Sequence, residues 1–264
     1  MFRIDPAAHV ARGAEIGTDV EIGPGAVIGP HVTIGAGTRI GPNALIDGWT
    51  DIGPGCRIHA FAVLGTDPQD LKFKGGPSKL IIGARTTIRE FATLNRATDE
   101  GDATRVGDDC LLMAYAHVAH NCVVGNNVIL ANAATLAGHV VIQDQAILGG
   151  LVPIHQFVHV GRLAFIGGMT RIAQDIPPFL RVAGSPIRLS GLNSVGLARR
   201  GVPPENRLAL KRAYRLFYRS GLRTAEALAA IRNDVEPLPE VLEFTRFIEE
   251  ADSRPAPYKR GVQR

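Results

Sequence analysis

An aliphatic residue recurs at every sixth position along most of the chain. One run extends from Val10 to Leu64, and a longer one extends from Val106 to Ile172. Neither the 3.6-residue period of an α-helix nor the alternation of an ordinary strand produces a spacing of six. Short repeats of fixed period are typical of stacked solenoids. The sequence therefore predicts a solenoid of very short strands.

The fifth place of each six-residue unit is also restricted, to Ala, Val, Thr or Cys. A branched aliphatic residue followed by a small one suits short strands that turn tight corners, and Gly, Asn and Asp supply the backbone angles of those corners. Three units would close one triangular coil, so residues 18 apart should stack. Parallel strands stacked in this way satisfy each other's backbone groups. We predict a mainly β protein, a parallel β-helix of hexapeptide repeats.

Two stretches interrupt the repeat, at residues 66–80 and 95–105. Both are polar or Gly-rich and lack the aliphatic step. Loops that project from a rigid scaffold commonly bind ligands. The alternative is an insertion that the surface merely tolerates, and we favour this interpretation for the second stretch.

The pattern stops at Pro177 and Pro178, and a linker over residues 183–191 follows. An amphipathic helix is expected over residues 205–221, because Pro203 and Pro204 precede it and its apolar residues share one face. Further helices are expected after Thr224 and near Pro239. We predict two domains, a β-helix over residues 1–185 and a small α-helical C-terminal domain over residues 186–264.

The three cysteines, Cys56, Cys110 and Cys122, all occupy the fifth place. This position marks them as small packing residues and argues against a covalent thiol mechanism. An odd number of cysteines suits a reducing compartment, and the N-terminus has no signal-peptide core. No apolar run is long enough to cross a bilayer. We therefore expect a cytoplasmic protein without a membrane span.

Basic residues concentrate in the C-terminal part of the chain. Nine Lys or Arg residues and one acid, Glu205, lie between Arg188 and Arg223. Such a cluster favours an acidic partner, and an ordinary solvated helix face is the alternative.

Stacking at intervals of 18 gathers half of the eight histidines within about three coils. His120, Gly138 and Gln156 fall in one row. Asn121, His139 and Phe157 fall in the next row. His117 lies earlier on the same coil as His120, and His155 adjoins Gln156.

Three roles compete for these histidines: a zinc site, structural packing and general base catalysis. Zinc needs converging, oriented ligands, and no carboxylate adjoins this stretch to orient them, so we expect no metal. Imidazole titrates near neutrality and can accept a proton from an attacking hydroxyl. We favour His120 as a general base. Gly138 is suited to stabilise an oxyanion through its N–H.

Paired glycines form a second candidate feature. Gly149 should stack on Gly167, and Gly150 on Gly168. A strip without side chains on successive coils would leave a shallow groove for an extended alkyl chain. Simple corner geometry explains the same glycines equally well.

Several motifs together resemble the UDP-N-acetylglucosamine O-acyltransferase family, whose members catalyse the first step of lipid A biosynthesis. The resemblance covers essentially the whole chain, and the combination is more specific than the hexapeptide repeat alone. The motifs are QDLK (69–72), HVAHNC (117–122), ATLAGHV (134–140), ILGG (147–150), HQF (155–157), AQDIPP (173–178) and GLARRG (196–201).

The resemblance implies a left-handed β-helix that assembles as a homotrimer, with active sites between neighbouring subunits. It implies transfer of an acyl group from an acyl carrier protein thioester to the 3-hydroxyl of the nucleotide sugar. The donor's phosphopantetheine belongs to that substrate, so no separate cofactor is expected, and no nucleic acid partner. The acidic carrier protein would suit the basic cluster.

The resemblance also assigns roles to residues, with His120 as the general base and Gly138 as the oxyanion donor. Its implied substrate contacts come from the first loop, the histidine-rich coils and the tail. They are Gln69, Asp70, Lys72, His117, His139, His155, Gln156, Gly168, Asn193, Arg199 and Arg200. Gly168 occupies the position whose side-chain size limits the acyl length.

Two positions depart from the family pattern. Asn121 stands where the family usually has Asp, and Val195 stands where Glu is common. An acceptor with a 3-amino group, which would give an amide product, is therefore an alternative. The other alternative is a β-helix that is a non-catalytic scaffold or binds a metal.

Overall fold

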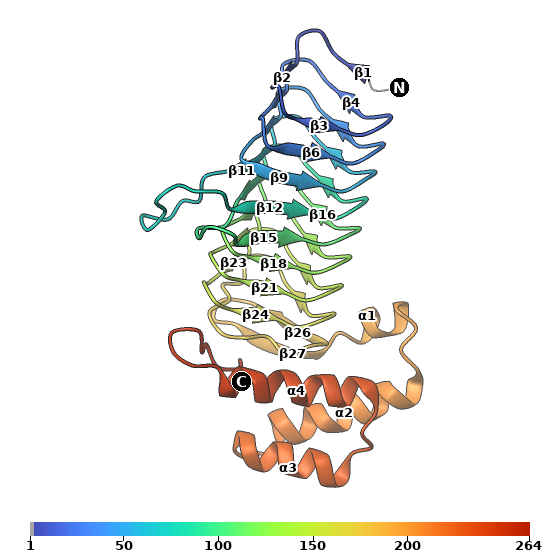
Figure 1. Cartoon of the computed structure of the whole chain (residues 1–264). Helices are drawn as coiled ribbons and strands as arrows, with labels where there is room; N and C mark the ends of the chain where they lie inside the picture. Colours follow the sequence, from blue (N-terminus) through green and yellow to red (C-terminus); the bar gives the residue numbers. More distant parts are fainter. Residues whose placement is uncertain (1–2) are drawn as a thin grey trace.

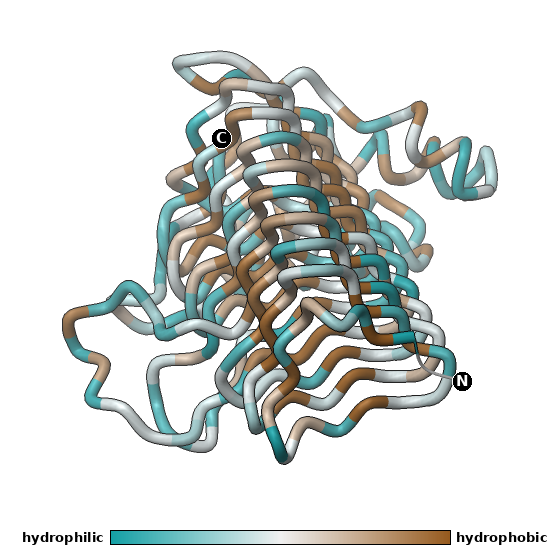
Figure 2. The backbone as a smooth tube through the Cα atoms, turned by 90° about the horizontal axis from the view of Figure 1, so that it is seen from above, coloured by the Kyte–Doolittle hydropathy of each residue, from teal (hydrophilic) through white to brown (hydrophobic). Residues whose placement is uncertain are grey.

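The computed structural model describes residues 3–264, which form a tall three-sided column with helices packed at its C-terminal end (Figure 1). Viewed along the column, successive coils lie over one another as triangles (Figure 2). Most strands contain only two residues. Each coil therefore consists of three short strands and three corners, as the spacing of six predicts.

Three sheets form the faces of the column, and all their pairings are parallel except that between β26 and β27. Sheet A contains β1 (Arg3–Ile4), β4 (Glu21–Ile22), β7 (Arg39–Ile40), β10 (Arg57–Ile58), β13 (Thr87–Ile88), β16 (Leu111–Leu112), β19 (Ile129–Leu130), β22 (Ile147–Leu148), β25 (Phe165–Ile166), β26 (Leu180–Ala183) and β27 (Arg188–Leu192).

Sheet B contains β2 (His9–Val10), β5 (Val27–Ile28), β8 (Leu45–Ile46), β11 (Val63–Thr66), β14 (Thr93–Asn95), β17 (His117–Val118), β20 (Thr135–Leu136) and β23 (Pro153–Ile154). Sheet C contains β3 (Glu15–Ile16), β6 (Val32–Ile34), β9 (Trp49–Ile52), β12 (Lys79–Ile82), β15 (Ala103–Val106), β18 (Val123–Val124), β21 (Val141–Ile142) and β24 (His159–Val160).

The strand register confirms the stacking of residues 18 apart. His117 pairs with Thr135, and Val123 pairs with Val141. The two interruptions shift the register locally, so that Thr93 pairs with His117. Both interruptions join a strand of sheet B to a strand of sheet C. The two loops therefore project from the same edge of the column, which we call the B–C edge (Figures 1 and 2).

Aliphatic side chains at the first place of each unit fill the narrow core. From Ile22 to Ile172 they are at most 3% exposed, whereas Val10 and Ile16 at the open N-terminal end are half-buried. Burial of apolar area on this scale is the main force holding the coils together.

The cysteines are packing residues, as predicted. All three are buried and free. The thiols of Cys56, Cys110 and Cys122 donate to the carbonyls of Gly83, Gly125 and Ala137 at 3.0–3.1 Å. Burial raises the pKa of Cys110 to about 11 and that of Cys122 to about 12. Neither thiol is an available nucleophile near neutral pH.

The corners are less restrictive than expected. Gly, Asn and Asp do adopt positive φ there, but so do larger residues, including Phe61, Tyr115, His139 and Phe157. Each coil fixes the corners of its neighbour through hydrogen bonds; the N–H of His139, for example, donates to the carbonyl of His120 at 3.0 Å. These contacts override the local preference for small residues.

The tail contains four helices: α1 (Ser194–Arg199), α2 (Pro204–Arg219), α3 (Thr224–Asp234) and α4 (Pro239–Ser253). The three longer helices begin where the sequence predicts, whereas α1 was not expected. The linker expected over residues 183–191 is also wrong in part, because β27 pairs antiparallel with β26 and becomes the last strand of sheet A. This pairing covers a sheet edge that would otherwise expose its backbone groups. The predicted boundary between residues 185 and 186 falls in the turn of this β-hairpin.

Candidate active site

The predicted row of His120, Gly138 and Gln156 lies at the B–C edge, between strands of sheets B and C on successive coils. A Cβ atom on Gly138 would lie 2.5 Å from both Cε1 and Nε2 of His120. Only glycine allows the imidazole to lie this close to the next coil. The N–H of Gly138 forms no hydrogen bond to any residue that the structure describes.

Both ring nitrogens of His120 have neighbours. Nδ1 lies 2.9 Å from Oδ1 of Asn121. Nε2 lies 3.8 Å from Oδ2 of Asp70, which comes from the first loop. The ring of His139 contacts the imidazole edge-on, with 5.2 Å between the ring centroids.

Asn121 is buried and makes three further hydrogen bonds. Its Nδ2 donates to Oδ2 of Asp102 at 2.6 Å. Its Oδ1 accepts from the N–H of Thr98 at 3.1 Å, and its own N–H donates to Oγ1 of Thr104 at 2.8 Å. All three partners belong to the second loop or the strand that follows it.

Two expectations from the sequence are therefore wrong. A carboxylate does lie close to the histidine-rich stretch, and two residues of the second interruption, Thr98 and Asp102, hold Asn121, so this interruption is not merely a tolerated insertion. Asp102 lies 18 residues before His120. It keeps the 18-residue spacing, but it falls within an interruption, where the repeat does not predict stacking.

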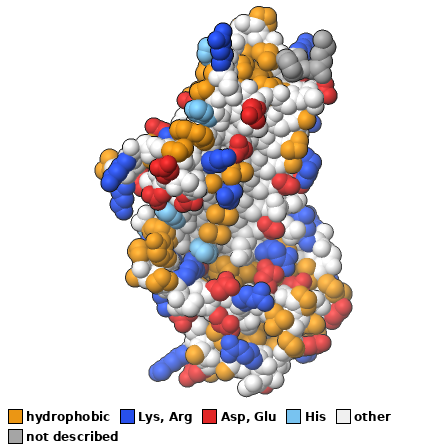
Figure 3. Space-filling view, viewed as in Figure 1, with side chains coloured by type: hydrophobic (Ala, Val, Ile, Leu, Met, Phe, Trp, Pro, Cys, Tyr) orange, Lys and Arg blue, Asp and Glu red, His pale blue; other side chains and the backbone are white. Residues whose placement is uncertain are grey.

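The other histidines lie along the same edge with distinct partners, and Figure 3 shows histidines following this edge below the projecting loop. Nδ1 of His117 is 2.7 Å from Oγ1 of Thr93. Nδ1 of His155 is 3.2 Å from the carbonyl oxygen of Gln156. Burial lowers the pKa of His117 and of His139, with the nearby His120 adding to the effect. Both imidazoles are therefore neutral at pH 7 and can donate or accept hydrogen bonds without charge.

The first loop is held against the column by Arg96, whose side chain is only 7% exposed. The guanidinium bonds Oδ1 of Asp67 through Nε at 3.1 Å and Nη2 at 2.7 Å, and Nη1 donates to the carbonyl of Gly76 at 2.5 Å. It also lies over the rings of Trp49 and Phe73, 5.1 and 4.9 Å from their centroids. No pattern in the sequence predicts this clamp.

A turn at the tip of this loop positions Asp70. Its Oδ1 accepts from the N–H of Lys72 at 3.0 Å, and its carbonyl accepts from Phe73 at 3.0 Å. Gln69 and Lys72 are exposed, and Leu71 between them is fully exposed. Of the predicted loop residues, Asp70 alone makes a recorded contact with His120 in the described chain.

The end of the chain returns to the same edge. Nε of Arg260 donates to the carbonyl of Gln156 at 2.8 Å, and its guanidinium lies over the ring of Phe157. Phe157 in turn stacks on His139, with ring centroids 4.9 Å apart, and contacts Tyr258 edge-on. These tail contacts were not predicted, because the tail carries no repeat from which a register could be read.

The predicted tail residues line a separate cavity of about 680 Å³. Gln145, Ile147, Leu163 and Phe165 of the column line one side, and Arg181, Asn193, Val195, Arg199 and Arg200 complete it. Three arginines in one cavity favour an anionic ligand. Asn193 has a structural role in addition, because its Oδ1 caps α1 by accepting from Gly196 and its Nδ2 donates to the carbonyl of Leu163.

The glycine pairs stack as predicted, and the structure separates their roles. A Cβ on Gly149 would lie 2.5 Å from the backbone of Gly168, and one on Gly167 would lie 2.8 Å from Ala183. These two are required by packing. A Cβ on Gly168 would lie 3.2 Å from the carbonyl oxygen of Gly150, and one on Gly150 would lie 3.3 Å from that of Asn132. Packing restricts Gly150 and Gly168 less strictly than Gly149 and Gly167, and the two leave a strip without side chains.

Within one chain, the predicted residues form two groups on different edges. The His120 row lies between sheets B and C, whereas Gly150 and Gly168 follow strands of sheet A, at the edge where the chain passes from sheet A to sheet B. The tail cavity also opens beside sheet A.

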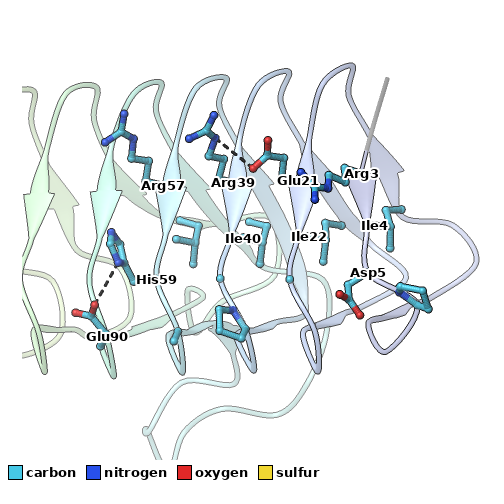
Figure 4. Close-up of a pocket in the computed structure, with 16 residues that line it drawn as sticks. Arg3, Ile4, Asp5, Glu21, Ile22, Arg39, Ile40, Arg57, His59 and Glu90 are labelled. Carbon is cyan, nitrogen blue, oxygen red and sulfur yellow. Dashed lines mark ion pairs between the residues drawn. The ribbon is translucent and has the colours of Figure 1, made fainter.

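A further groove of about 670 Å³ lies on sheet A in the N-terminal coils (Figure 4). Arg3, Glu21, Arg39 and Arg57 line it in register, and Glu21 pairs with Arg39 at 3.4 Å. None of the predicted site residues lies there.

The described residues contain no group of three or more His, Cys, Asp or Glu side chains placed to hold a metal ion. None of the helices in the described part of the chain is long and apolar enough to cross a membrane.

Comparison with known proteins first defines the class. The family "Bacterial transferase hexapeptide (six repeats)" matches residues 31–66 and 103–138. The column and its edge site are those of a hexapeptide-repeat transferase with a left-handed parallel β-helix.

More specific matches follow. The family "Udp N-acetylglucosamine O-acyltransferase; Domain 2" matches residues 175–262. Two similar proteins, from Verminephrobacter eiseniae and Synechocystis sp., are both named acyl-[acyl-carrier-protein]–UDP-N-acetylglucosamine O-acyltransferase. The first is 52% identical over 88% of each chain. The second is 50% identical over 74% of this chain and 70% of its own. The solved structure of LpxA from Acinetobacter baumannii has a TM-score of 0.92 and 37% identity over 99% of both chains. The chain belongs to the UDP-N-acetylglucosamine O-acyltransferase family.

Proposed function

We propose that this protein transfers a 3-hydroxyacyl chain from acyl carrier protein to the 3-hydroxyl of UDP-N-acetylglucosamine, the first step of lipid A biosynthesis. One observation carries the proposal. The imidazole of His120 is held through Nδ1, while Nε2 lies over Gly138 beside a free backbone N–H. Family membership identifies the substrates, because the relatives are named for them.

The geometry suggests how the residues divide the chemistry. Oδ1 of Asn121 accepts a hydrogen bond from Nδ1–H of His120, so the lone pair of the imidazole is on Nε2. Nε2 takes the proton of the sugar 3-hydroxyl as its oxygen attacks the thioester carbonyl. The N–H of Gly138 stabilises the oxyanion of the tetrahedral intermediate. Its collapse releases the pantetheine thiolate, which recovers the proton from the imidazolium.

The remaining predicted residues would bind the two substrates. Asp70, His117, His139, His155 and Gln156 surround His120 and would hold the sugar or the pantetheine arm. Arg199 and Arg200 in the tail cavity, with Asn193, would bind the nucleotide or the carrier's phosphopantetheine. Their charge suits the phosphates, and the basic tail suits an acidic carrier protein. We propose that the reaction needs no metal or added cofactor and takes place in the cytoplasm.

A homotrimer would complete the site. His120 and the tail cavity lie on different edges of one chain. Cyclic assembly places one edge of each copy against a different edge of the next, so that each site would draw residues from two chains. The strip without side chains at Gly150 and Gly168 would then face the partner as a groove for the acyl chain.

The alternative acceptor with a 3-amino group has less support. It rested on Asn121 and Val195, but the relatives at about 50% identity are named O-acyltransferases. The non-catalytic and metal-binding alternatives are likewise disfavoured by these names.

The test is turnover by the purified protein with acyl carriers of several lengths and with both 3-hydroxy and 3-amino nucleotide sugars. We expect the 3-hydroxy sugar to be used, and His120→Ala to lose turnover by roughly 10²-fold or more. His9→Ala, on the first coil, is the matched control and should behave as wild type. Near-normal turnover by His120→Ala would exclude the proposed base, and preference for the amino sugar would exclude the proposed acceptor.

A further inference from the structure

We propose that Asp102 is a positioning residue for His120, acting through the side-chain amide of Asn121. The inference deepens the proposed function and rests on the role of His120 as the base. It follows from a continuous chain of side chains, carboxylate to amide to imidazole, with contacts of 2.6 and 2.9 Å.

The carboxylate of Asp102 determines which way the amide points. A carboxylate can only accept hydrogen bonds, so the NH₂ group of Asn121 must face it. The amide oxygen then faces Nδ1 of His120, which must carry the proton. The N–H of Thr98 donates to the same oxygen and supports the same orientation. Nε2 is thereby kept as the unprotonated nitrogen, on the side of Gly138.

The same series of hydrogen-bonded side chains places the negative charge of Asp102 on the far side of Asn121 from the base. When His120 takes the substrate proton, the imidazolium polarises the amide, and the far end of the amide is bonded to a carboxylate. Hydrogen bonds to charged groups are stronger than those between neutral groups, and chains of them reinforce one another. Asp102 would thus support the imidazolium from a distance.

Other ionisable groups around His120 are Asp70 from the first loop, His117 from the same coil and His139 from the next coil. Asp70 approaches Nε2, at 3.8 Å, and belongs to the side on which substrate would bind. The two histidines are kept neutral by burial. In the described part of the chain, the hydrogen bonds that begin at Nδ1 of His120 therefore lead to one carboxylate, that of Asp102.

The arrangement can be tested by exchanging the two side chains. Asn121 has a φ of 57°, a conformation that both Asn and Asp tolerate better than other non-glycine residues. Asn121→Asp alone would set two carboxylates against each other. Asp102→Asn alone would keep a hydrogen bond but remove the charge. The double exchange, Asp102→Asn with Asn121→Asp, restores one amide and one carboxylate with the polarity reversed.

The experiment measures kcat, KM for both substrates and the pH profile of kcat/KM for these variants and for the wild type. We expect Asp102→Asn to lower kcat by about tenfold to a hundredfold, less than loss of the base itself. KM should change little. The acid limb should move to lower pH, because the imidazolium loses its support. The double exchange should recover most of kcat and return the acid limb of the kcat/KM profile to its wild-type position. Glu100→Gln removes a charge from the same exposed loop and is the matched control, expected to leave the profile unchanged.

Wild-type kcat and an unshifted pH profile in Asp102→Asn would overturn the inference. A double variant no more active than the less active single variant would also overturn the inference. The comparison is informative because a purely structural loop contact would not depend on which of the two positions carries the carboxylate. His120→Ala separates the two proposals. If it is inactive while Asp102→Asn is normal, only the inference fails; if it remains active, the proposed base fails and the inference fails with it.

Discussion

At the scale of single residues, the corners of the coil orient the side chains of the site. Asn121, His139 and Phe157 stack at one corner position with φ of 57–65°. Hydrogen bonds between coils fix this conformation; the N–H of Phe157, for example, donates to the carbonyl of Gly138. Side chains at these corners therefore stand in columns along the edge, which is why His139 stacks on Phe157. A rigid corner holds catalytic groups more precisely than a free loop would.

Gly138→Ala tests this close approach. The added Cβ would lie 2.5 Å from the imidazole of His120, so the ring must move. Because small displacements of a reacting group are costly, we expect kcat/KM to fall by about a hundredfold. Steady-state kinetics would measure the loss, and the thermal transition would show that the column remains folded. Turnover close to wild type would mean that the ring does not need this position.

At the scale of elements, the two loops form one unit. Residues of the second interruption hold the first loop through Arg96 and hold Asn121 through Asp102. Nδ2 of Asn95 also donates to Oγ1 of Thr66 and to the carbonyl of Asp67. The position of Asp70 beside His120 thus depends on a loop that does not itself contact the imidazole in the recorded hydrogen bonds.

Arg96→Ala should release the first loop while leaving the coils intact. We expect amide hydrogen exchange over residues 66–80 to accelerate, and kcat/KM to fall by about tenfold to a hundredfold as Asp70 loses its position. Arg105→Ala, an exposed arginine on the neighbouring strand, is the control. Unchanged exchange in the first loop of Arg96→Ala would show that other contacts hold it.

The junction between the column and the tail contains two groups whose titrations oppose each other. Asp175 is fully buried, pairs with Arg254 and accepts from the N–H of His159 at 2.7 Å. Burial raises the pKa of Asp175 to about 6 and lowers the pKa of His159 to about 4. The raised pKa of Asp175 stabilises the fold at low pH, and this contribution is lost as pH rises through 6. The lowered pKa of His159 stabilises the fold above its ordinary value of 6.5, and this contribution is lost as pH falls towards 4.

Removing either group should therefore leave the pH dependence that the other contributes to the free energy of unfolding. Relative to wild type, the free energy of unfolding of His159→Gln should rise between pH 7 and pH 5, and that of Asp175→Asn should fall, each by on the order of 2 kcal/mol at most. Urea unfolding at several pH values measures these slopes. Identical slopes in both variants would contradict the opposing titrations.

At the scale of the whole molecule, the predicted site residues lie on different faces of one column. The candidate base lies at the B–C edge, whereas the arginine cavity and the strip without side chains at Gly150 and Gly168 lie beside sheet A. In the proposed trimer, the edges of neighbouring copies would bring the two groups together.

Complementation between inactive variants tests this sharing. His120→Ala and the double variant Arg199→Ala/Arg200→Ala should each be nearly inactive alone. If the chain assembles as proposed, every trimer that contains both variants has one site of three with an intact base and intact arginines from different chains, so purified mixed trimers should regain about one third of the wild-type activity. Co-expression with separate affinity tags provides the mixed trimers. No recovery in mixed trimers would mean that each chain uses its own residues.

The repeat alone predicted the stacked parallel β-helix and one row of the site, whereas its left hand was predicted from the family resemblance and the tail helices from separate signals. A strict period fixes which residues stack, because each coil must place its aliphatic residues inside and pair its backbone with the next. From that rule alone His120, Gly138 and Gln156 could be placed together, and the burial of Cys122 could be predicted. The identity of the substrates could be predicted only from the resemblance to a family, because the repeat specifies where residues lie and not which reaction they catalyse.

Only the tertiary structure decided what the non-repeating segments do. The clamp at Arg96, the return of Tyr258 and the bond from Asn193 to Leu163 join segments whose separation in sequence follows no period. Asp102 keeps the 18-residue spacing to His120 but lies within an interruption of the repeat. Their positions depend on the path of loops and tail, which local preferences do not specify. The sequence determined the column and the histidine row, because a repeat is a local rule applied many times. The surroundings that tune those histidines were decided by contacts that occur once.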